Sequence, residues 1–195
     1  YRAIPGMQVE IMTYVAPEGP RVPKDTEVCQ VMATLPGQSD RRVILGGHFD
    51  SLNLVGTDGP GDFARVIDNP APGANDDASG VAVGLAAAAT APQKPLNTLV
   101  FVAFSGEEQG LLGAKALSLR AKQEGWDVLA MLNYDMVGSS RNRAGDYDPH
   151  QIRVFSEESA HHHSRELARI LEWNGRNQTV WPKLVFRKDR YGRGG

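Results

Sequence analysis

The chain has 195 residues, of which 41% are hydrophobic and 23% charged, a composition typical of a folded globular domain of moderate size. Its formal net charge of −2 offers no basic footprint for nucleic acid or for an anionic membrane surface. No apolar stretch approaches the ~20 residues of a membrane-spanning helix, and the single cysteine, Cys29, excludes an internal disulfide.

The first third of the chain predicts strands followed by a long loop. Residues 7–15 and 28–35 alternate between apolar and polar side chains, as half-buried strands do, and Cys29 is expected in the core. After the turn LPGQSD, residues 43–47 form a short apolar strand that can pair with the strand before it as a hairpin. Residues 51–75 are rich in Gly, Pro, Asp and Asn and predict a long loop, a feature that is often functional.

From residue 79 onward, predicted helices and strands alternate. Residues 79–91 are apolar almost all round, which indicates a buried helix, and residues 110–125 predict a second helix that stops at Gly125. Residues 96–104 and 126–138 predict buried strands. A strand at 151–157, a helix at 160–174 and a strand at 183–189 complete the pattern. The alternation predicts an α/β domain with a mixed, largely parallel central sheet.

Acidic and imidazole side chains follow the ends of three of these strands and precede the buried helix: His48 and Asp50, Glu107 and Glu108, Asp135, and the pair Asp76–Asp77. Each motif alone has a simple explanation, such as a surface turn or a helix N-cap. Together they indicate a site, because ligands bind beyond the carboxyl ends of strands in open α/β sheets. Carboxylates gathered in this way need a cation, and one histidine with several carboxylates suits zinc better than calcium or magnesium.

The motifs GGHFDS, GANDDASG, SGEEQGLLG and NYDMVG resemble, in order and approximate spacing, those of the co-catalytic di-zinc aminopeptidases of the bacterial leucyl aminopeptidase type, metallopeptidase family twenty-eight. The resemblance covers about residues 28–195. It implies a three-layer αβα fold of the zinc exopeptidase type and a zinc-dependent exopeptidase, most simply an aminopeptidase that removes N-terminal residues from peptides. It also implies two Zn²⁺ ions in the complete enzyme and a secreted or periplasmic location. The oligomeric state is not indicated.

The resemblance assigns roles by position. His48 corresponds to a ligand of one zinc, Asp76 to the carboxylate that bridges both, Asp135 to a ligand beside His48, and Glu108 to a ligand of the other zinc. Glu107 corresponds to the general base that takes a proton from the attacking water. Asp50 corresponds to the carboxylate that orients the ligand histidine, and the Asp76–Asp77 peptide bond is expected to be cis.

One part of the family pattern is not found within these residues. The family has a further histidine ligand in a segment similar to Tyr-Gly-Ser-Asp-His, whereas this chain reads DRYGRGG and stops at Gly195. The sequence is therefore expected to be a single catalytic domain, truncated at its N-terminus and before that last ligand, that binds at most one zinc tightly, at the His48 side. The run His161–His163 opens a predicted helix and is not taken as a replacement ligand.

Other functional classes share this fold. Glutaminyl cyclases use one zinc for an intramolecular aminoacyl transfer, and receptor-type relatives keep the fold without activity. Carboxypeptidase relatives use the same metal ligands. The doubled acids in NDDASG and SGEEQG resemble the peptidases more closely than the cyclases.

Overall fold

The computed structural model describes residues 1–53, 55, 69–141, 144–156 and 163–185. The chain divides into two compact units, Tyr1–Gly138 and Ser139–Gly195. In the first unit the elements are β1 (Gln8–Ala16), β2 (Thr26–Leu35), β3 (Ser39–His48), α2 (Ala78–Thr90), β4 (Asn97–Phe104), α3 (Leu112–Gln123) and β5 (Val128–Asn133). In the second unit they are β6 (Gln151–Val154), α4 (His163–Gly175) and β7 (Trp181–Leu184).

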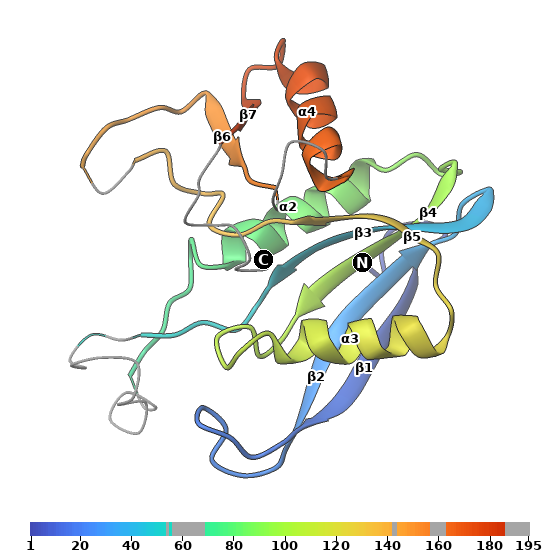
Figure 1. Ribbon diagram of the computed structural model, residues 1–195, viewed down its shortest axis with the longest axis vertical. Coiled ribbons are helices and arrows are strands. Elements are labelled where there is room, and N and C mark those ends of the chain that lie inside the picture. Colours follow the sequence, from blue (N-terminus) through green and yellow to red (C-terminus); the bar gives the residue numbers. More distant parts are fainter. Residues whose placement is uncertain (54, 56–68, 142–143, 157–162, 186–195) are drawn as a thin grey trace. The chain divides into compact units, whose positions relative to one another are not determined.

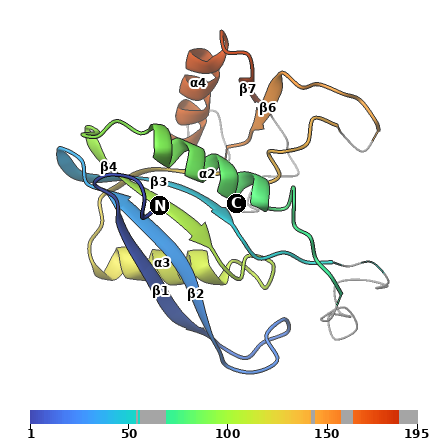
Figure 2. The ribbon, with the colours of Figure 1, turned by 180° about the vertical axis from the view of Figure 1, so that it is seen from behind.

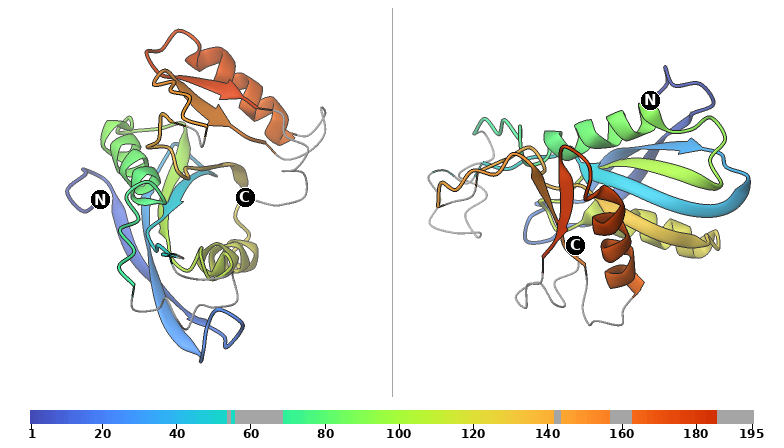
Figure 3. Two further views of the ribbon diagram at one scale, coloured as in Figure 1. Left: turned by 90° about the vertical axis from the view of Figure 1, so that its left-hand side faces the viewer. Right: turned by 90° about the horizontal axis from the view of Figure 1, so that it is seen from above.

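The first unit is built on a five-stranded mixed sheet in the order β1-β2-β4-β3-β5. The pairs β1–β2 and β2–β4 are antiparallel, whereas β3 pairs in parallel with both β4 and β5. Helix α2 covers one face of this sheet and α3 covers the other, as Figures 1 and 2 show from opposite sides and Figure 3 shows along the sheet. The expected α/β architecture of three layers with a mixed sheet is confirmed.

The expected hairpin between β2 and β3 is wrong, because β4 lies between these two strands. The short connection between them passes across the beginning of β4. There, the Gly37 N–H donates to Thr98 Oγ1, and a Cβ on Gly37 would lie 2.3 Å from the carbonyl carbon of Asn97. The central place of β4 follows from its side chains, since Val100, Phe101 and Val102 are all at most 2% exposed. A strand that is apolar on both faces is buried best in the middle of a sheet.

Two hydrophobic clusters hold the helices against the sheet. On the α3 side, Val100, Val102 and Phe104 pack in one cluster with Leu117 of α3. On the α2 side, Phe101 packs with Ala88 of α2. The two sets alternate along β4, as the two-residue period of a strand requires.

The expectation that Cys29 lies in the core is wrong, and its neighbour Gln30 is buried in its place. Cys29 is exposed, and its neighbour in β1, Thr13, is exposed too. Gln30 is 1% exposed and points toward the start of α3, where its Nε2 donates to the carbonyl of Gly113 over 3.1 Å. The register of β2 therefore places an amide in the interior, where a hydrogen bond from its NH₂ group to the backbone of α3 offsets part of the cost of burial.

Two elements expected to be buried are partly exposed. Helix α2 turns Gly80, Gly84 and Ala88 toward the sheet, but Leu85 on its other side is 41% exposed. Strand β5 lies at the end of the sheet order, and Met131 in this strand is 44% exposed. In both cases the apolar sequence predicts burial on every side, but the described part of the chain covers only one side of the helix or strand.

The second unit has its own small sheet, in which β6 and β7 pair in parallel and are connected through α4. The last strand begins at Trp181, two residues before its expected start. His161, His162 and the whole DRYGRGG segment lie outside the described residues, whereas His163 begins α4. Among the described residues, no helix combines the length and the apolar character that a membrane crossing requires.

Candidate metal centre

The predicted site residues meet at one edge of the sheet. Strands β3, β4 and β5 run parallel, so their carboxyl ends lie at the same edge, and the residues that follow them carry His48, Glu107, Glu108 and Asp135. Asp76 reaches this edge from the segment before α2. The strand ends therefore bring these groups to one edge of the sheet, as the sequence predicted.

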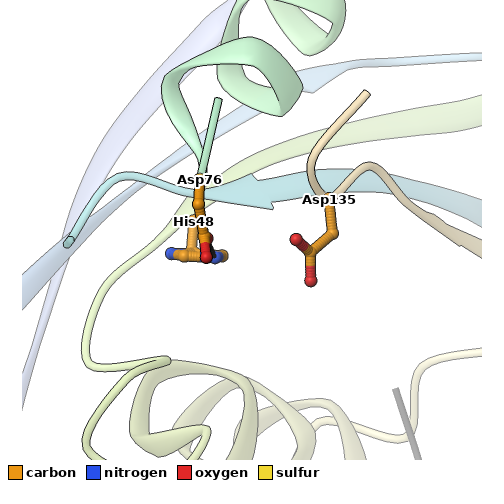
Figure 4. A group of neighbouring side chains, drawn as sticks. All are labelled: His48, Asp76 and Asp135. Carbon is orange, nitrogen blue, oxygen red and sulfur yellow. Dashed lines mark ion pairs between the residues drawn. The ribbon is translucent and has the colours of Figure 1, made fainter. Parts of the chain in front are cut away.

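His48, Asp76 and Asp135 form a three-residue group in which one possible ligand atom from each residue lies within 4.8 Å of the others. Figure 4 shows the three side chains, which come from the end of β3, from the segment before α2 and from the end of β5. Nε2 of His48 is 3.0 Å from Oδ1 of Asp76, and the imidazole is 96% buried while the Asp76 side chain is half exposed. The group thus has a fixed nitrogen and two carboxylates that solvent can reach.

The backbone of Asp50 sets the orientation of the His48 ring. Nδ1 of His48 lies 2.9 Å from the carbonyl oxygen of Asp50. Because a carbonyl oxygen can only accept a hydrogen bond, Nδ1 must carry a proton, so Nε2, which faces Asp76, is the nitrogen left to bind a metal ion. A histidine that binds a metal through one nitrogen usually donates from the other in this way.

The carboxylate of Asp50 has a different set of partners. It lies 3.7 Å from Nδ1 of His48, but it accepts hydrogen bonds from the backbone N–H groups of Glu107, over 3.2 Å, and Glu108, over 3.1 Å. Asp50 therefore links two strand ends: its carbonyl holds the imidazole after β3, and its side chain holds the paired glutamates after β4.

The turn that carries Glu107 and Glu108 is also held from the β1–β2 side. The Tyr14 hydroxyl donates to the carbonyl of Ser105 over 3.0 Å, and Arg21 Nη1 donates to the carbonyl of Glu108 over 2.6 Å. The carbonyl of Glu107 accepts from the N–H groups at the start of α3. With its backbone fixed on both sides, this turn presents two adjacent carboxylates in set positions.

Glu107 and Glu108 differ in their relation to the three-residue group. Glu107 Oε2 is 4.0 Å from Nε2 of His48, close to the group without belonging to it. Glu108 also lies outside the group. The assignment of Glu107 as base and of Glu108 as a second-metal ligand stays a prediction, and so do the ligand roles of the other three residues.

The electrostatics of the site reflect crowding of like charges. Burial raises the pKa of Glu107, and the charges of Asp135, Asp50 and Asp76 raise it further, whereas His48 acts in the opposite direction. The pKa of Glu108 is likewise raised, by burial and then by Asp76 and Glu107. Burial alone would lower the pKa of His48, but the Asp50 carbonyl and the surrounding carboxylates outweigh it, so this pKa is raised.

This donor set fits a divalent cation of the zinc type. The neighbouring carboxylates help to raise the pKa of Glu107 and of Glu108, and a positive charge placed among them relieves this crowding. One imidazole nitrogen, with its tautomer already fixed, and two carboxylates match the nitrogen and oxygen ligands that zinc accepts in catalytic sites, where three protein ligands are usual. His48, Asp76 and Asp135 are the residues that would hold the ion.

The sequence did not reveal the contacts of Asp77. The peptide bond between Asp76 and Asp77 is cis, as expected. Asp77 is the N-cap of α2, and its carboxylate accepts from the N–H of Gly80 over 3.0 Å. It also accepts from the N–H of His48 and of Met136, each over 3.1 Å. An acidic residue before a helix signals the first contact but not the other two, because those depend on strands distant in the sequence.

Comparison with known proteins agrees with these observations. Residues 30–180 match peptidase family M28. A protein of Pyrenophora tritici-repentis named "Probable zinc metalloprotease" is 39% identical over 191 residues, an alignment that covers 86% of this chain and 42% of that protein. The chain therefore spans less than half the length of this relative.

Solved structures with the same fold are more distant in sequence. Legionella pneumophila LapA aminopeptidase aligns over 92% of this chain and 40% of its own, with a TM-score of 0.60 and 19% identity. A glutaminyl cyclase from an Acidobacteriales bacterium aligns over 92% of this chain and 58% of its own, with a TM-score of 0.63 and 18% identity. These similarities establish the fold alone, whereas the match over residues 30–180 shows that the chain belongs to peptidase family M28.

Proposed function

We propose that this protein is a zinc-dependent exopeptidase, and more narrowly an aminopeptidase that removes N-terminal residues from peptides. The observation that carries the proposal is that His48, Asp76 and Asp135 lie close enough together to hold a metal ion, with the carboxylate of Glu107 beside them. Membership of peptidase family M28 and relatives named as zinc metalloproteases support a zinc-dependent peptidase, the coarser part of this proposal.

A bound zinc ion supplies Lewis-acid chemistry, in that it makes water more acidic and polarises a peptide carbonyl. The protein supplies a base in the right place. Glu107 is held at its backbone by Asp50, and its carboxylate is free to accept a proton from the attacking water and to return it to the leaving amine.

Glutaminyl cyclase activity is the second candidate. The cyclase structures resemble this chain as closely as the aminopeptidase structures do, with TM-scores of 0.63 and 0.60. Relatives above 30% identity, however, carry the name zinc metalloprotease. These relatives and the doubled acids of the two motifs favour the peptidase.

The test is product analysis with the complete, zinc-loaded protein and a pair of peptides that differ only in N-terminal acetylation. We expect stepwise loss of N-terminal residues from the free peptide and no cleavage of the acetylated one. Loss of C-terminal residues from both would indicate a carboxypeptidase instead. Conversion of an N-terminal glutamine to pyroglutamate without hydrolysis would indicate a cyclase, and no reaction with any substrate would indicate a non-catalytic relative.

A further inference from the structure

We propose that Asp77 is a positioning residue for the metal centre, whose buried carboxylate fixes the backbone of all three segments that carry the predicted ligands. This inference rests on the proposed function, since it assumes the metal centre. Asp77 is 1% exposed, and both of its carboxylate oxygens are engaged by backbone N–H groups. None of the assigned roles in the site uses this residue.

Each contact of Asp77 is made next to a predicted ligand. Oδ2 accepts from the N–H of His48 itself. Oδ1 accepts from the N–H of Met136, which directly follows Asp135. Asp76 precedes Asp77 in the chain, so its main chain is fixed by the same residue. A single carboxylate therefore connects the ends of β3 and β5 to the beginning of α2.

Helix capping by itself accounts for only one of these contacts. An N-cap side chain accepts from a backbone N–H in the first turn of its own helix, which here is Gly80. The hydrogen bonds from His48, at the end of β3, and from Met136, in the segment after β5, are unnecessary for the helix. Met136 has a φ of +50°, a left-handed conformation that is unusual outside glycine, and the bond to Asp77 holds its N–H in that conformation.

Two glycines, Gly47 and Gly80, lie close against the carboxylate of Asp77. A Cβ on Gly47, the residue before His48, would lie 2.8 Å from Asp77 Oδ2, and a Cβ on Gly80 would lie 2.5 Å from the same atom. Glycine at both positions lets the carboxylate approach two backbones at once. The two glycines of the GGH and ASG stretches are thus explained by the space that the side chain of Asp77 needs.

The experiment compares Asp77→Asn with the unsubstituted protein, both as the complete chain. Asparagine is as good an N-cap as aspartate, so the bond to Gly80 can persist. It has only one carbonyl oxygen, so its NH₂ must face the N–H of His48 or those of Gly80 and Met136. We expect zinc affinity, measured by competition with a chelator, to fall ~10- to 100-fold. We also expect the visible absorption spectrum of the Co²⁺-substituted variant to change, because the ligand geometry changes.

Asp25→Asn is the matched control, because the Asp25 carboxylate also accepts a backbone N–H, that of Glu18, but in the exposed β1–β2 connection. This variant should bind zinc as the unsubstituted protein does. Zinc affinity within twofold of the unsubstituted value and an unchanged Co²⁺ spectrum in Asp77→Asn would overturn the inference while leaving the proposed function standing. A failure of the unsubstituted protein to bind zinc would overturn both.

A measurement on the unsubstituted protein decides the matter if Asp77→Asn does not fold. Amide hydrogen exchange, followed by NMR, should show slow exchange for His48 and Met136 as well as for Gly80. Fast exchange at His48 and Met136 with protection at Gly80 alone would reduce Asp77 to a helix cap and overturn the inference.

Discussion

Gly80 and Gly84 lie one turn apart on the buried side of α2, but the space around them differs. A Cβ on Gly80 would lie 2.3 Å from the carbonyl oxygen of Tyr134, more than 1 Å closer than an ordinary contact, and 2.5 Å from Oδ2 of Asp77. Among the described residues, a Cβ on Gly84 would have only Tyr1 Oη nearby, at 3.5 Å, which is an ordinary contact. Substitution by alanine at the two positions should therefore change stability in opposite directions.

The size of each effect can be estimated from the contacts. Alanine favours a helix over glycine by about 1 kcal/mol, so Gly84→Ala should raise the free energy of unfolding by about that amount. Gly80→Ala gains the same helix preference but forces α2 away from the rigid backbone of Tyr134. Overpacking of this kind costs about 1–3 kcal/mol, and each weakened hydrogen bond of Asp77 adds about 1 kcal/mol. The net expectation is a loss of about 2 kcal/mol.

Urea unfolding followed by circular dichroism, in the presence of a chelator, measures both changes without a contribution from zinc. Equal slopes of the unfolding free energy against urea would show that the variants unfold from comparable states. The two variants should differ by about 3 kcal/mol, the sum of the opposing effects. A Gly80→Ala variant as stable as Gly84→Ala would refute the close approach of α2 to the end of β5.

Three further predictions concern the paired glutamates and their supports. Glu107→Gln should lower kcat at least ~100-fold at unchanged zinc content, whereas Glu108→Ala should lower zinc content measured by atomic absorption; equal zinc loss in both would show that the roles are misassigned. Asp50→Asn removes one of the two carboxylate oxygens that accept the N–H groups of this turn, and should lower kcat by about 10-fold or more; an unchanged kcat would mean that the other contacts hold the turn alone. Tyr14→Phe should cost about 1 kcal/mol of unfolding free energy through its lost bond to Ser105, and a variant of unchanged stability would mean that this bond contributes nothing net.

Much of the fold follows from local sequence patterns. The alternating and apolar runs predicted β1 to β5 to within a few residues, and Gly125, with a φ of +65°, ends the helix region of α3 as expected. The order of the strands was not predictable in the same way. β4 lies between β2 and β3 because it pairs with segments more than 50 residues away in the sequence. The residue pattern within β2 or β3 does not predict this pairing.

The site shows the same division between local and long-range information. His48, Asp76 and Asp135 could be proposed because strand ends and a helix start are visible in the sequence, and the geometry brings them together. Two sets of hydrogen bonds could not be predicted in this way: those of Asp50 to the N–H groups of Glu107 and Glu108, and that of Asp77 to Met136. The partners of a carboxylate depend on which backbone segments the fold places around it. Both supports join elements that are 57 or more residues apart.

The most direct test of the metal centre is anomalous diffraction at the zinc absorption edge from crystals of the complete, zinc-loaded protein. We predict an anomalous peak at ~2.0–2.2 Å from Nε2 of His48 and from carboxylate oxygens of Asp76 and Asp135, with Glu107 beside it and not bound to it. A zinc peak that contacts none of these three residues, or zinc-loaded crystals with no peak at this edge of the sheet, would contradict the account.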